Sequence, residues 1–164
     1  MFVAVVALLT GRPSAESADP TPHQGTFPRA EVVRIVDGDT IVVVIDGREE
    51  RVRYVGVDAP ELANRDTGAA AECGADRATD ANRDLVADVQ VELERDTSDR
   101  DRFGRLLRHV WTTVDGERVL VGEQLVADGA IEARSYPPDT RYDGRLDAAE
   151  RDARSAALGI WGSC

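Results

Sequence analysis

Three β-branched segments separated by short Asp-Gly turns dominate the first half of the sequence. Glu31–Val36, Thr40–Asp46 and Arg51–Val57 are rich in valine and isoleucine or alternate apolar with polar side chains, as half-buried strands do. Asp37-Gly38 separates the first two segments, and Asp46-Gly47 is the signature of a tight hairpin. Because such short connections join antiparallel neighbours, we predict three consecutive antiparallel strands.

The rest of the chain predicts two more strands and three helices. Alternation indicates strands over Val89–Arg95 and Arg105–Thr113, and apolar spacing indicates helices over Gly74–Asp88, Val119–Asp128 and Asp143–Leu158. Because helices do not follow the strands one by one, this order favours an α+β fold over a parallel sheet. We therefore expect a five-stranded antiparallel β-barrel of the oligonucleotide-binding (OB-fold) type with three α-helices.

Acidic side chains outnumber basic ones, by 31 Asp and Glu to 20 Lys and Arg, which gives a net charge of −11. Every basic residue is an arginine, and the acids lean towards aspartate. A net acidic chain is a poor generic binder of nucleic acid, because phosphate affinity depends on cationic side chains that displace counterions. We favour salt adaptation (a halophilic protein) as the origin of the acids; codon bias in a GC-rich genome is the alternative.

The N-terminus predicts export. Residues 1–9 form an apolar run that is too short to span a bilayer, and small residues follow around Ala15–Ala18. This pattern predicts a signal peptide and a secreted protein, held at the cell envelope if the segment stays uncleaved. Because no positively charged residues precede the apolar run, a stray apolar tail is the alternative. Residues 10–29 are rich in Pro, Ser, Ala and Gly and predict a disordered linker, so we place a single folded domain at residues 30–164.

The chain has two cysteines, Cys73 and Cys164, and neither belongs to a Cys-x-x-Cys metal motif. An even number in an exported chain favours one disulfide, which would close a loop of about 90 residues and contribute roughly 3–5 kcal/mol. Two unpaired thiols are the alternative. We favour the disulfide because Cys164 is the last residue, at an end that would otherwise fray.

The residue types that are absent or rare in the sequence exclude several kinds of catalytic and binding site. Without lysine there is no Walker A phosphate loop. His23 in the linker and His109 in a predicted strand offer no multi-histidine metal site or histidine triad. Three polar clusters remain at the ends of apolar strands: Asp37–Thr40, Arg53–Glu61 and Asp99–Arg105. Each alone is typical of a plain turn or a solvated charged loop.

Together, the three clusters supply what phosphodiester hydrolysis needs. Asp39 and Asp58, at strand ends, are candidate oxygen ligands for a hard cation that neutralises charge on the phosphoryl group. Glu61 is a candidate to orient or deprotonate the attacking water. Arg53 and Arg105 are candidates for a phosphate clamp, because the planar guanidinium holds two phosphate oxygens at once.

At these clusters the sequence closely resembles the staphylococcal nuclease (thermonuclease) family. The resemblance covers about residues 31–162 and keeps the family's order and spacing. It rests on six matching segments: Val36–Thr40, Arg53–Glu61, Asp101–Arg105, Glu123–Val126, Tyr136–Pro138 and Leu158–Trp161. Any one segment could arise by chance, whereas their joint presence is specific.

The resemblance implies a Ca²⁺-dependent nuclease that hydrolyses DNA and RNA with little sequence preference and leaves 3′-phosphate ends. By this resemblance, Asp39 and Asp58 would bind Ca²⁺ through their carboxylates. Ala59, where the family usually has threonine, would bind Ca²⁺ through its backbone carbonyl. Asp37 would lie next to these ligands without binding the ion itself. These roles are expectations that the resemblance carries over position by position.

The same resemblance assigns the remaining site residues. Glu61 would be the base or water-orienting carboxylate, and Arg53 and Arg105 would stabilise the transition state. Three side chains would contact the substrate: Arg102, Phe103 and Tyr136. Arg102 and Phe103 replace a lysine and a tyrosine of the family, so the charge is kept and a hydroxyl is lost.

We interpret the chain as an exported, monomeric nuclease acting preferentially on single-stranded or frayed DNA and RNA, with Ca²⁺ as its cofactor. The rival is a catalytically silent OB-fold module that binds nucleic acid or a protein partner. A barrel whose charges merely solvate it is the third interpretation, and it does not explain why charges gather at three strand boundaries. Against the silent module, all five residues of the expected catalytic set are present: Asp39, Arg53, Asp58, Glu61 and Arg105.

Salt adaptation predicts a measurable response to ionic strength. Molar salt screens the repulsion among the acidic side chains, so we expect a higher melting temperature in molar KCl than in dilute buffer. Differential scanning fluorimetry across a salt series measures this. A melting temperature that stays flat or falls would leave codon bias as the explanation of the acidic composition.

Overall fold

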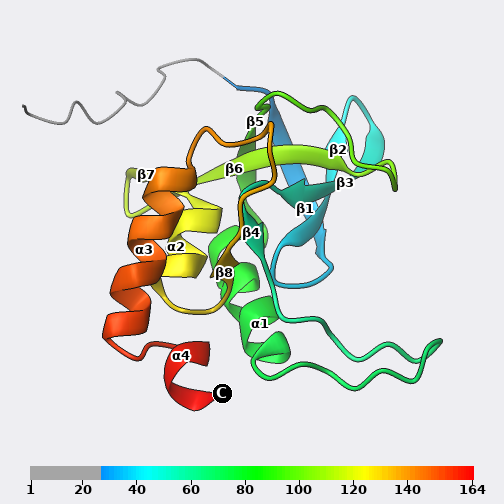
Figure 1. The fold of residues 1–164 in the computed structure, drawn as a ribbon. Helices are drawn as coiled ribbons and strands as arrows, with labels where there is room; N and C mark the ends of the chain where they lie inside the picture. The colour runs from blue at the N-terminus through cyan, green and yellow to red at the C-terminus, as the bar shows by residue number, and fades with distance from the viewer. Residues whose placement is uncertain (1–26) are drawn as a thin grey trace, which may run out of the picture.

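The computed structural model describes residues 27–164, and five of its strands close into a β-barrel (Figure 1). The predicted signal segment and most of the predicted linker lie in residues 1–26, outside the described residues. The barrel strands are β1 (Arg29–Ile35), β2 (Thr40–Ile45), β3 (Arg48–Tyr54), β5 (Gln90–Glu94) and β6 (Leu106–Val114). They follow the order β3-β2-β1-β5-β6, and the barrel closes by pairing β3 with β6.

The β2–β3 hairpin forms where the Asp-Gly turn predicts it. Asp46 and Gly47 have φ angles of 50° and 75°, the left-handed values that a tight hairpin turn requires. The pairing then runs from Ile45 opposite Arg48 to Thr40 opposite Arg53. The turn therefore fixes the register that brings Arg53 to the strand end beside Asp39.

One barrel pair is parallel, which the expectation of an antiparallel barrel did not contain. β3 and β6 run in the same direction, with Val52 opposite Leu106 and Arg53 opposite Leu107. Five strands that alternate in direction around a ring must bring two strands of the same direction together where the ring closes. The odd number of strands therefore makes the barrel mixed.

The third predicted strand, Arg51–Val57, is divided in the structure. Gly56 has a φ angle of 82°, which turns the chain out of β3. The chain then forms the short β4 (Val57–Asp58), which pairs with β8 (Glu132–Ala133). This small second sheet connects the cluster after β3 to the segment that precedes Tyr136.

Helices cover one side and one end of the barrel. They are α1 (Ala75–Val86), α2 (Val121–Ala127), α3 (Asp143–Ser155) and the short α4 (Ile160–Ser163). Figure 1 shows α2 and α3 side by side, with α1 below the barrel and α4 at the C-terminus. The three predicted helices correspond to α1–α3. The second begins two residues later than expected, because β7 (Glu117–Leu120) continues the sheet to its start.

The barrel and helices share one core, formed mainly by aliphatic side chains of the strands and of α2. Fully buried members include Ile41, Val52, Val91, Val110 and Leu125. No helix within residues 27–164 has both the length and the apolar character needed to cross a membrane.

A buried carboxylate, Glu94, organises one side of this core. Its side chain is 0% exposed and accepts hydrogen bonds from Trp111 Nε1 at 2.7 Å and from the Tyr142 hydroxyl at 2.9 Å. Arg141 forms an ion pair with the same carboxylate. Burying an acid is costly unless it is paired and hydrogen-bonded; here three donors from β6 and the α3 region satisfy it.

Replacing Glu94 with glutamine is expected to destabilise the protein by about 2–4 kcal/mol. The amide keeps the volume but loses the charge that pairs with Arg141, and its NH₂ group cannot accept the tyrosine and indole donors. Urea unfolding measures the loss. Glu49→Gln is the matched control, because the Glu49 side chain is 67% exposed and its removal should cost under about 0.5 kcal/mol. Equal losses in both variants would contradict the role of the buried network.

Candidate active site

Asp37 and Asp39 lie on the β1–β2 turn, which packs directly against α1. A Cβ atom on Gly38 would come within 2.8 Å of the Cβ atoms of both Ala59 and Ala78, so only glycine permits this close approach. Asn82 of α1 donates from Nδ2 to the Asp37 carbonyl at 2.8 Å. The Asp37 carboxylate in turn accepts the Asp39 N–H at 3.0 Å. The helix and the turn thus hold Asp39 in place.

Arg53 joins the first two sequence clusters. Its Nη1 lies 3.0 Å from Oδ2 of Asp39, and its Nη2 donates to Oδ1 of Asp58 at 2.7 Å. The guanidinium also donates to the carbonyls of Tyr54 and Val57, and its side chain is only 12% exposed. The two carboxylates predicted to share a site are therefore brought to one arginine.

Asp39 is buried, with 5% of its surface exposed. Its carboxylate accepts the Thr40 hydroxyl at 2.9 Å and the Ala59 N–H at 2.8 Å. Burial raises the pKa of Asp39 from 3.8 to about 7, against the opposing attraction of Arg53, and the negative charge of Asp37 adds to the rise. The acid therefore occupies a place that favours an additional positive charge.

The carboxylates of Asp39 and Asp58 are of the kind that fits a hard cation such as Ca²⁺, which prefers carboxylate, carbonyl and water oxygens. Within residues 27–164 no cluster of three or more Asp, Glu, His or Cys side chains is arranged to hold a metal. A cation here would depend on these two carboxylates, on the Ala59 carbonyl and on water. The raised pKa of Asp39 is consistent with this fit, because a cation offsets the cost of burying its charge.

Arg105 lies with Arg53 along one hollow of about 210 Å³, which Tyr136 also lines. Asp101 holds Arg105 in place: it accepts the Arg105 backbone N–H at 3.0 Å and its Nε at 2.6 Å. The Arg105 side chain is 27% exposed and lines the hollow. The structure thus brings two of the three expected catalytic side chains to one cavity of a size suited to a phosphate group.

Glu61 lies outside this hollow, on the loop that follows β4. It is exposed, and its backbone N–H donates to the Glu72 carboxylate at 2.9 Å. It follows Asp58 by three residues in the sequence, and within residues 27–164 no hydrogen bond or ion pair joins its side chain to Arg53 or Arg105.

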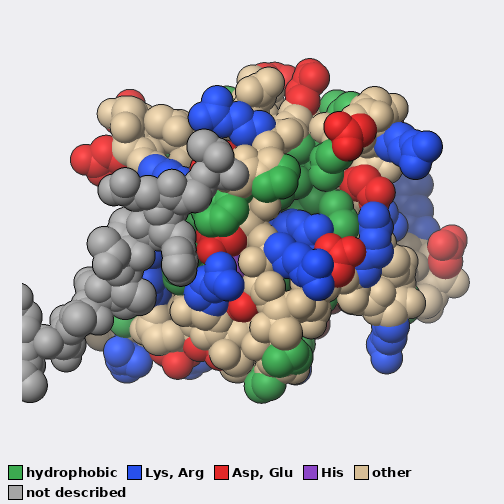
Figure 2. Space-filling view, turned by 90° about the horizontal axis from the view of Figure 1, so that it is seen from above, with side chains coloured by type: hydrophobic (Ala, Val, Ile, Leu, Met, Phe, Trp, Pro, Cys, Tyr) green, Lys and Arg blue, Asp and Glu red, His purple; other side chains and the backbone are tan. Residues whose placement is uncertain are grey.

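The three expected substrate contacts are exposed. Phe103 is 69% exposed, with the guanidinium carbon of Arg102 at 4.6 Å from its ring and that of Arg105 at 5.6 Å. Tyr136 is 43% exposed at the rim of the hollow. On the face seen from above in Figure 2, arginine and acidic side chains lie close together and the arginines do not form one continuous basic surface. The positive charge available to a phosphate therefore comes from individual arginines and not from an extended basic surface.

Arg134 is a site residue that sequence reasoning missed. Its Nη1 donates to Oδ2 of Asp58 at 2.7 Å, so this carboxylate is paired with Arg53 on one oxygen and with Arg134 on the other. Arg134 reaches Asp58 because it directly follows β8, which pairs with β4. No local pattern in the sequence signals that pairing.

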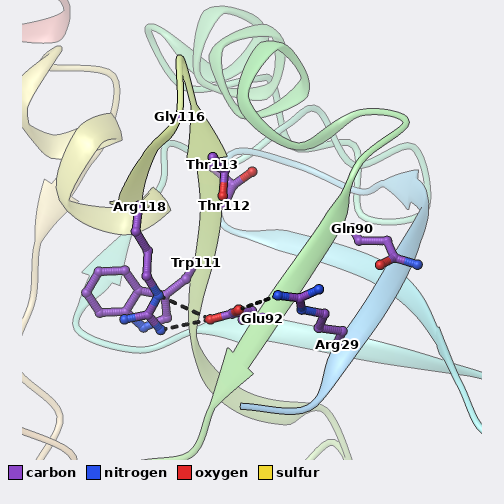
Figure 3. A pocket seen from close by; sticks show the side chains of 8 residues that line it. All are labelled: Arg29, Gln90, Glu92, Trp111, Thr112, Thr113, Gly116 and Arg118. Carbon is purple, nitrogen blue, oxygen red and sulfur yellow. Dashed lines mark hydrogen bonds and ion pairs between the residues drawn. The ribbon is translucent and has the colours of Figure 1, made fainter. Parts of the chain in front are cut away.

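A second hollow, of about 230 Å³, lies over β5, β6 and β7 (Figure 3). Arg29 and Arg118 both pair there with Glu92, and Arg118 stacks over the Trp111 ring at 4.0 Å. One carboxylate thus pairs with both arginines of this hollow. None of the sequence-predicted site residues lines it.

The raised pKa of Asp39 predicts how the metal-free protein responds to pH. The folded state holds this proton more tightly than the unfolded state, so the free energy of unfolding falls as the pH rises from 3.8 towards 7. At about 1.4 kcal/mol per pKa unit the change amounts to a few kcal/mol. Urea unfolding in chelator at several pH values should show the fall, and Asp39→Asn should flatten it. Parallel curves for the two proteins would contradict the shift.

Comparison with known proteins places the chain in a family. The model of the staphylococcal nuclease homologues matches residues 51–163. The thermonuclease of Staphylococcus hyicus is 32% identical over 131 residues, which are 80% of this chain and 74% of that protein. The thermonuclease of Staphylococcus intermedius is 34% identical over 130 residues, 79% of this chain and 74% of that protein.

A relative from another genus gives the same result. Endonuclease YncB of Bacillus subtilis (strain 168) is 38% identical over 146 residues, which are 86% of this chain and 66% of that protein. The family match spans more than half of the chain and includes the segments that carry Arg53, Asp58, Glu61 and Arg105. With its barrel and its paired arginines and carboxylates, this chain belongs to the staphylococcal nuclease homologue family.

Proposed function

We propose that this protein is a Ca²⁺-dependent nuclease that hydrolyses phosphodiester bonds in DNA and RNA, with little sequence specificity and with 3′-phosphate ends as products. Relatives named thermonuclease and endonuclease support the nuclease activity. The observation that carries the proposal is Arg53, which pairs with both Asp39 and Asp58 and lines the same hollow as Arg105.

The carboxylates of Asp39 and Asp58 and the carbonyl of Ala59 would hold the cation. Bound there, Ca²⁺ would supply positive charge to the phosphoryl oxygens and would lower the pKa of a bound water. Asp37 keeps the Asp39 backbone in place through the hydrogen bond at 3.0 Å and adds negative charge behind the ligand. Ca²⁺ suits such a site because it accepts irregular sets of oxygen ligands, whereas Mg²⁺ demands a near-octahedral set.

The protein side chains perform the proton and charge chemistry. The Glu61 carboxylate orients the attacking water and accepts its proton as the water oxygen bonds to phosphorus. Arg53 and Arg105 bind the phosphoryl oxygens and stabilise the charge that develops there. Breaking the bond from phosphorus to the 5′ oxygen then leaves a 3′-phosphate on one product, and the departing 5′ oxygen takes up a proton from solvent to become the 5′-hydroxyl of the other.

Exposed aromatic side chains favour single-stranded or frayed substrates. Tyr136 lines the hollow that holds Arg105, and the Phe103 ring lies 5.6 Å from the Arg105 guanidinium carbon. Unpaired bases can stack on such rings at about 1–3 kcal/mol each. Arg102 beside Phe103 offers a charge for an adjacent phosphate. A duplex hides its base faces and would use these side chains less well.

Export of the protein as a monomer is part of the proposal. The disulfide between Cys73 and Cys164 suits an oxidising compartment, and the apolar N-terminal run suits a signal peptide. A secreted nuclease also meets Ca²⁺ outside the cell without needing a high affinity for it.

The proposal predicts Ca²⁺-dependent cleavage of single-stranded DNA that depends on Glu61 and Arg105. In Glu61→Gln and Arg105→Ala, kcat is expected to fall by roughly 10²–10³-fold, because each substitution removes a group that acts on the transition state. Matched controls are Glu49→Gln and Arg83→Ala, which remove an exposed acid of β3 and an exposed arginine of α1. Steady-state cleavage in molar salt with Ca²⁺, and with chelator, measures the effects; end-labelled products identify the 3′-phosphate.

Two results of this experiment would contradict the proposal. Cleavage that survives both site substitutions would place the chemistry at a different site. A folded protein that binds single-stranded DNA but does not cut it at any Ca²⁺ concentration would establish the silent OB-fold module instead.

A further inference from the structure

The loop that carries Glu61 leaves the barrel after β4 and returns to start α1 (Figure 1). Its two arms pair like a narrow hairpin, with Asn64 bridged to Ala69. At its base a single residue, Glu72, holds Glu61 twice. The Glu72 N–H donates to the Glu61 carbonyl at 2.9 Å, and the Glu72 carboxylate accepts the Glu61 N–H at 2.9 Å.

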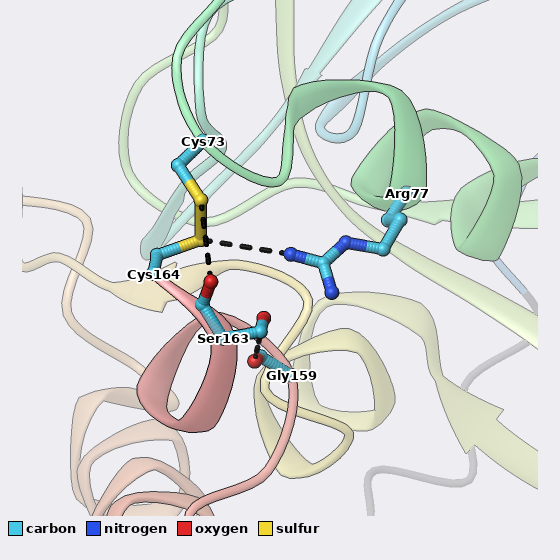
Figure 4. Close-up of a disulfide and its surroundings, with 5 residues drawn as sticks. All are labelled: Cys73, Arg77, Gly159, Ser163 and Cys164. Atoms are coloured by element: carbon cyan, nitrogen blue, oxygen red, sulfur yellow. Dashed lines mark hydrogen bonds between the residues drawn. A yellow bond between two sulfur atoms is a disulfide. The ribbon is translucent and has the colours of Figure 1, made fainter.

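A covalent bond anchors the residue next to Glu72. Cys73 and Cys164 form a disulfide with an Sγ–Sγ distance of 2.05 Å and a sequence separation of 91 residues (Figure 4). It joins the base of the loop to the residue that follows α4. No other disulfide is present among the described residues, which contain both cysteines of the chain.

The element on the other side of the disulfide is firmly attached to the rest of the fold. The Ile160 N–H, at the start of α4, donates to the Gly129 carbonyl at 2.8 Å. A Cβ on Gly159 would lie 2.1 Å from the Gly129 oxygen, so the two backbones are in direct contact. Gly74 packs closely against Ile160, because a Cβ there would lie 2.6 Å from Ile160 Cγ2. The loop is thus bound to a rigid support.

We propose that Glu72 and the Cys73–Cys164 disulfide position Glu61, so that full nuclease activity requires the oxidised protein. This inference rests on the proposed function, in which Glu61 acts on the attacking water. Glu72 is a positioning residue: it touches the Glu61 backbone and needs no contact with the substrate. The disulfide keeps Glu72 at the place from which it does so.

Positioning matters here because the loop has little else to hold it. Most residues from Glu61 to Cys73 are exposed, so few buried apolar contacts oppose local opening. The two Glu61–Glu72 hydrogen bonds and the disulfide act at the base of the loop, and the Asn64–Ala69 bridge acts further out. A catalytic group must be held within about 0.5 Å, and a misplacement of 1 Å can cost as much as 10²-fold in rate.

The disulfide is accessible to a reductant. Cys73 and Cys164 are both exposed, and Arg77 places Nη2 at 3.6 Å from Cys164 Sγ. A guanidinium at that position favours the thiolate that leaves when a thiol attacks Cys73. With a dithiol as reductant, two electrons and two protons pass to the pair, which becomes two thiols, and the dithiol closes into its own disulfide.

The first test compares the oxidised and the dithiol-reduced protein in steady-state cleavage of single-stranded DNA with Ca²⁺. We expect reduction to lower kcat at least tenfold, to change KM and the Ca²⁺ affinity by less than twofold, and to be reversed by reoxidation. Hydrogen exchange supplies a readout without turnover: the Glu61 amide should exchange faster after reduction, whereas barrel amides should not. An unchanged kcat in the reduced, folded protein would overturn the proposal.

Variants that keep the disulfide test Glu72 itself, even if the reduced protein proves unstable. Glu72→Ala removes the acceptor of the Glu61 N–H and should lower kcat without raising KM, whereas Glu72→Gln retains an acceptor oxygen and should restore most of the rate. Asp66→Ala is the matched control, because Asp66 lies at the tip of the same loop and is exposed. Equal rates in Glu72→Ala and Asp66→Ala would overturn the positioning role.

The Glu61→Gln background separates this inference from the function on which it rests. With the Glu61 carboxylate gone, reduction should lower kcat no further, because both changes act on one group. A full tenfold loss in that background would make the effect a general structural one and overturn the inference. If Glu61→Gln alone kept the full kcat, the proposed role of Glu61 would fail first, and the positioning proposal would fail with it.

Discussion

The guanidinium of Arg53 is the contact on which both the fold of the site and its chemistry depend. It pairs with Asp39 from the β1–β2 turn and with Asp58 from β4, and it donates to the carbonyls of Tyr54, at the end of β3, and Val57, in β4. Asp39 is almost fully buried, so removing its arginine would leave an unpaired charge inside the protein, which is among the costliest defects of a fold. The ion pairs therefore tie three separate chain segments together at the place where the reaction is proposed.

Closure of the barrel explains why Arg105 lies near Arg53. The parallel seam places Arg53 opposite Leu107, two residues after Arg105, so the loop before β6 necessarily reaches the end of β3. Asp101 then fixes Arg105 through two hydrogen bonds. The position of Arg105 near Arg53 thus follows from the register of the β3–β6 pair, which is the parallel pair that the antiparallel expectation did not contain.

Most of the fold and site features that could be predicted came from short-range patterns in the sequence. Asp46-Gly47 indicated the hairpin because its backbone geometry is set by two residues, and the polar cluster around Arg53 stood out against apolar strands. Arg134 and Glu72 were missed for the opposite reason. Arg134 reaches Asp58 only through the β4–β8 pairing, and Glu72 reaches Glu61 only across the base of a loop; neither contact leaves a periodic pattern or a motif in the sequence.

An acidic protein can still provide a phosphate site, because carboxylates hold the arginines near the hollow in position before a phosphate binds. Arg53 and Arg134 share Asp58, and Arg105 pairs with Asp101. On the proposed function, Asp39 and Asp58 would hold the cation with oxygens that now pair with Arg53 and Arg134, and these guanidinium groups would then be free to bind the substrate phosphate. Linkage then requires the converse: a phosphate that draws the arginines away strengthens cation binding by the same factor. Cation and nucleic acid should therefore bind cooperatively although the chain as a whole repels polyanions.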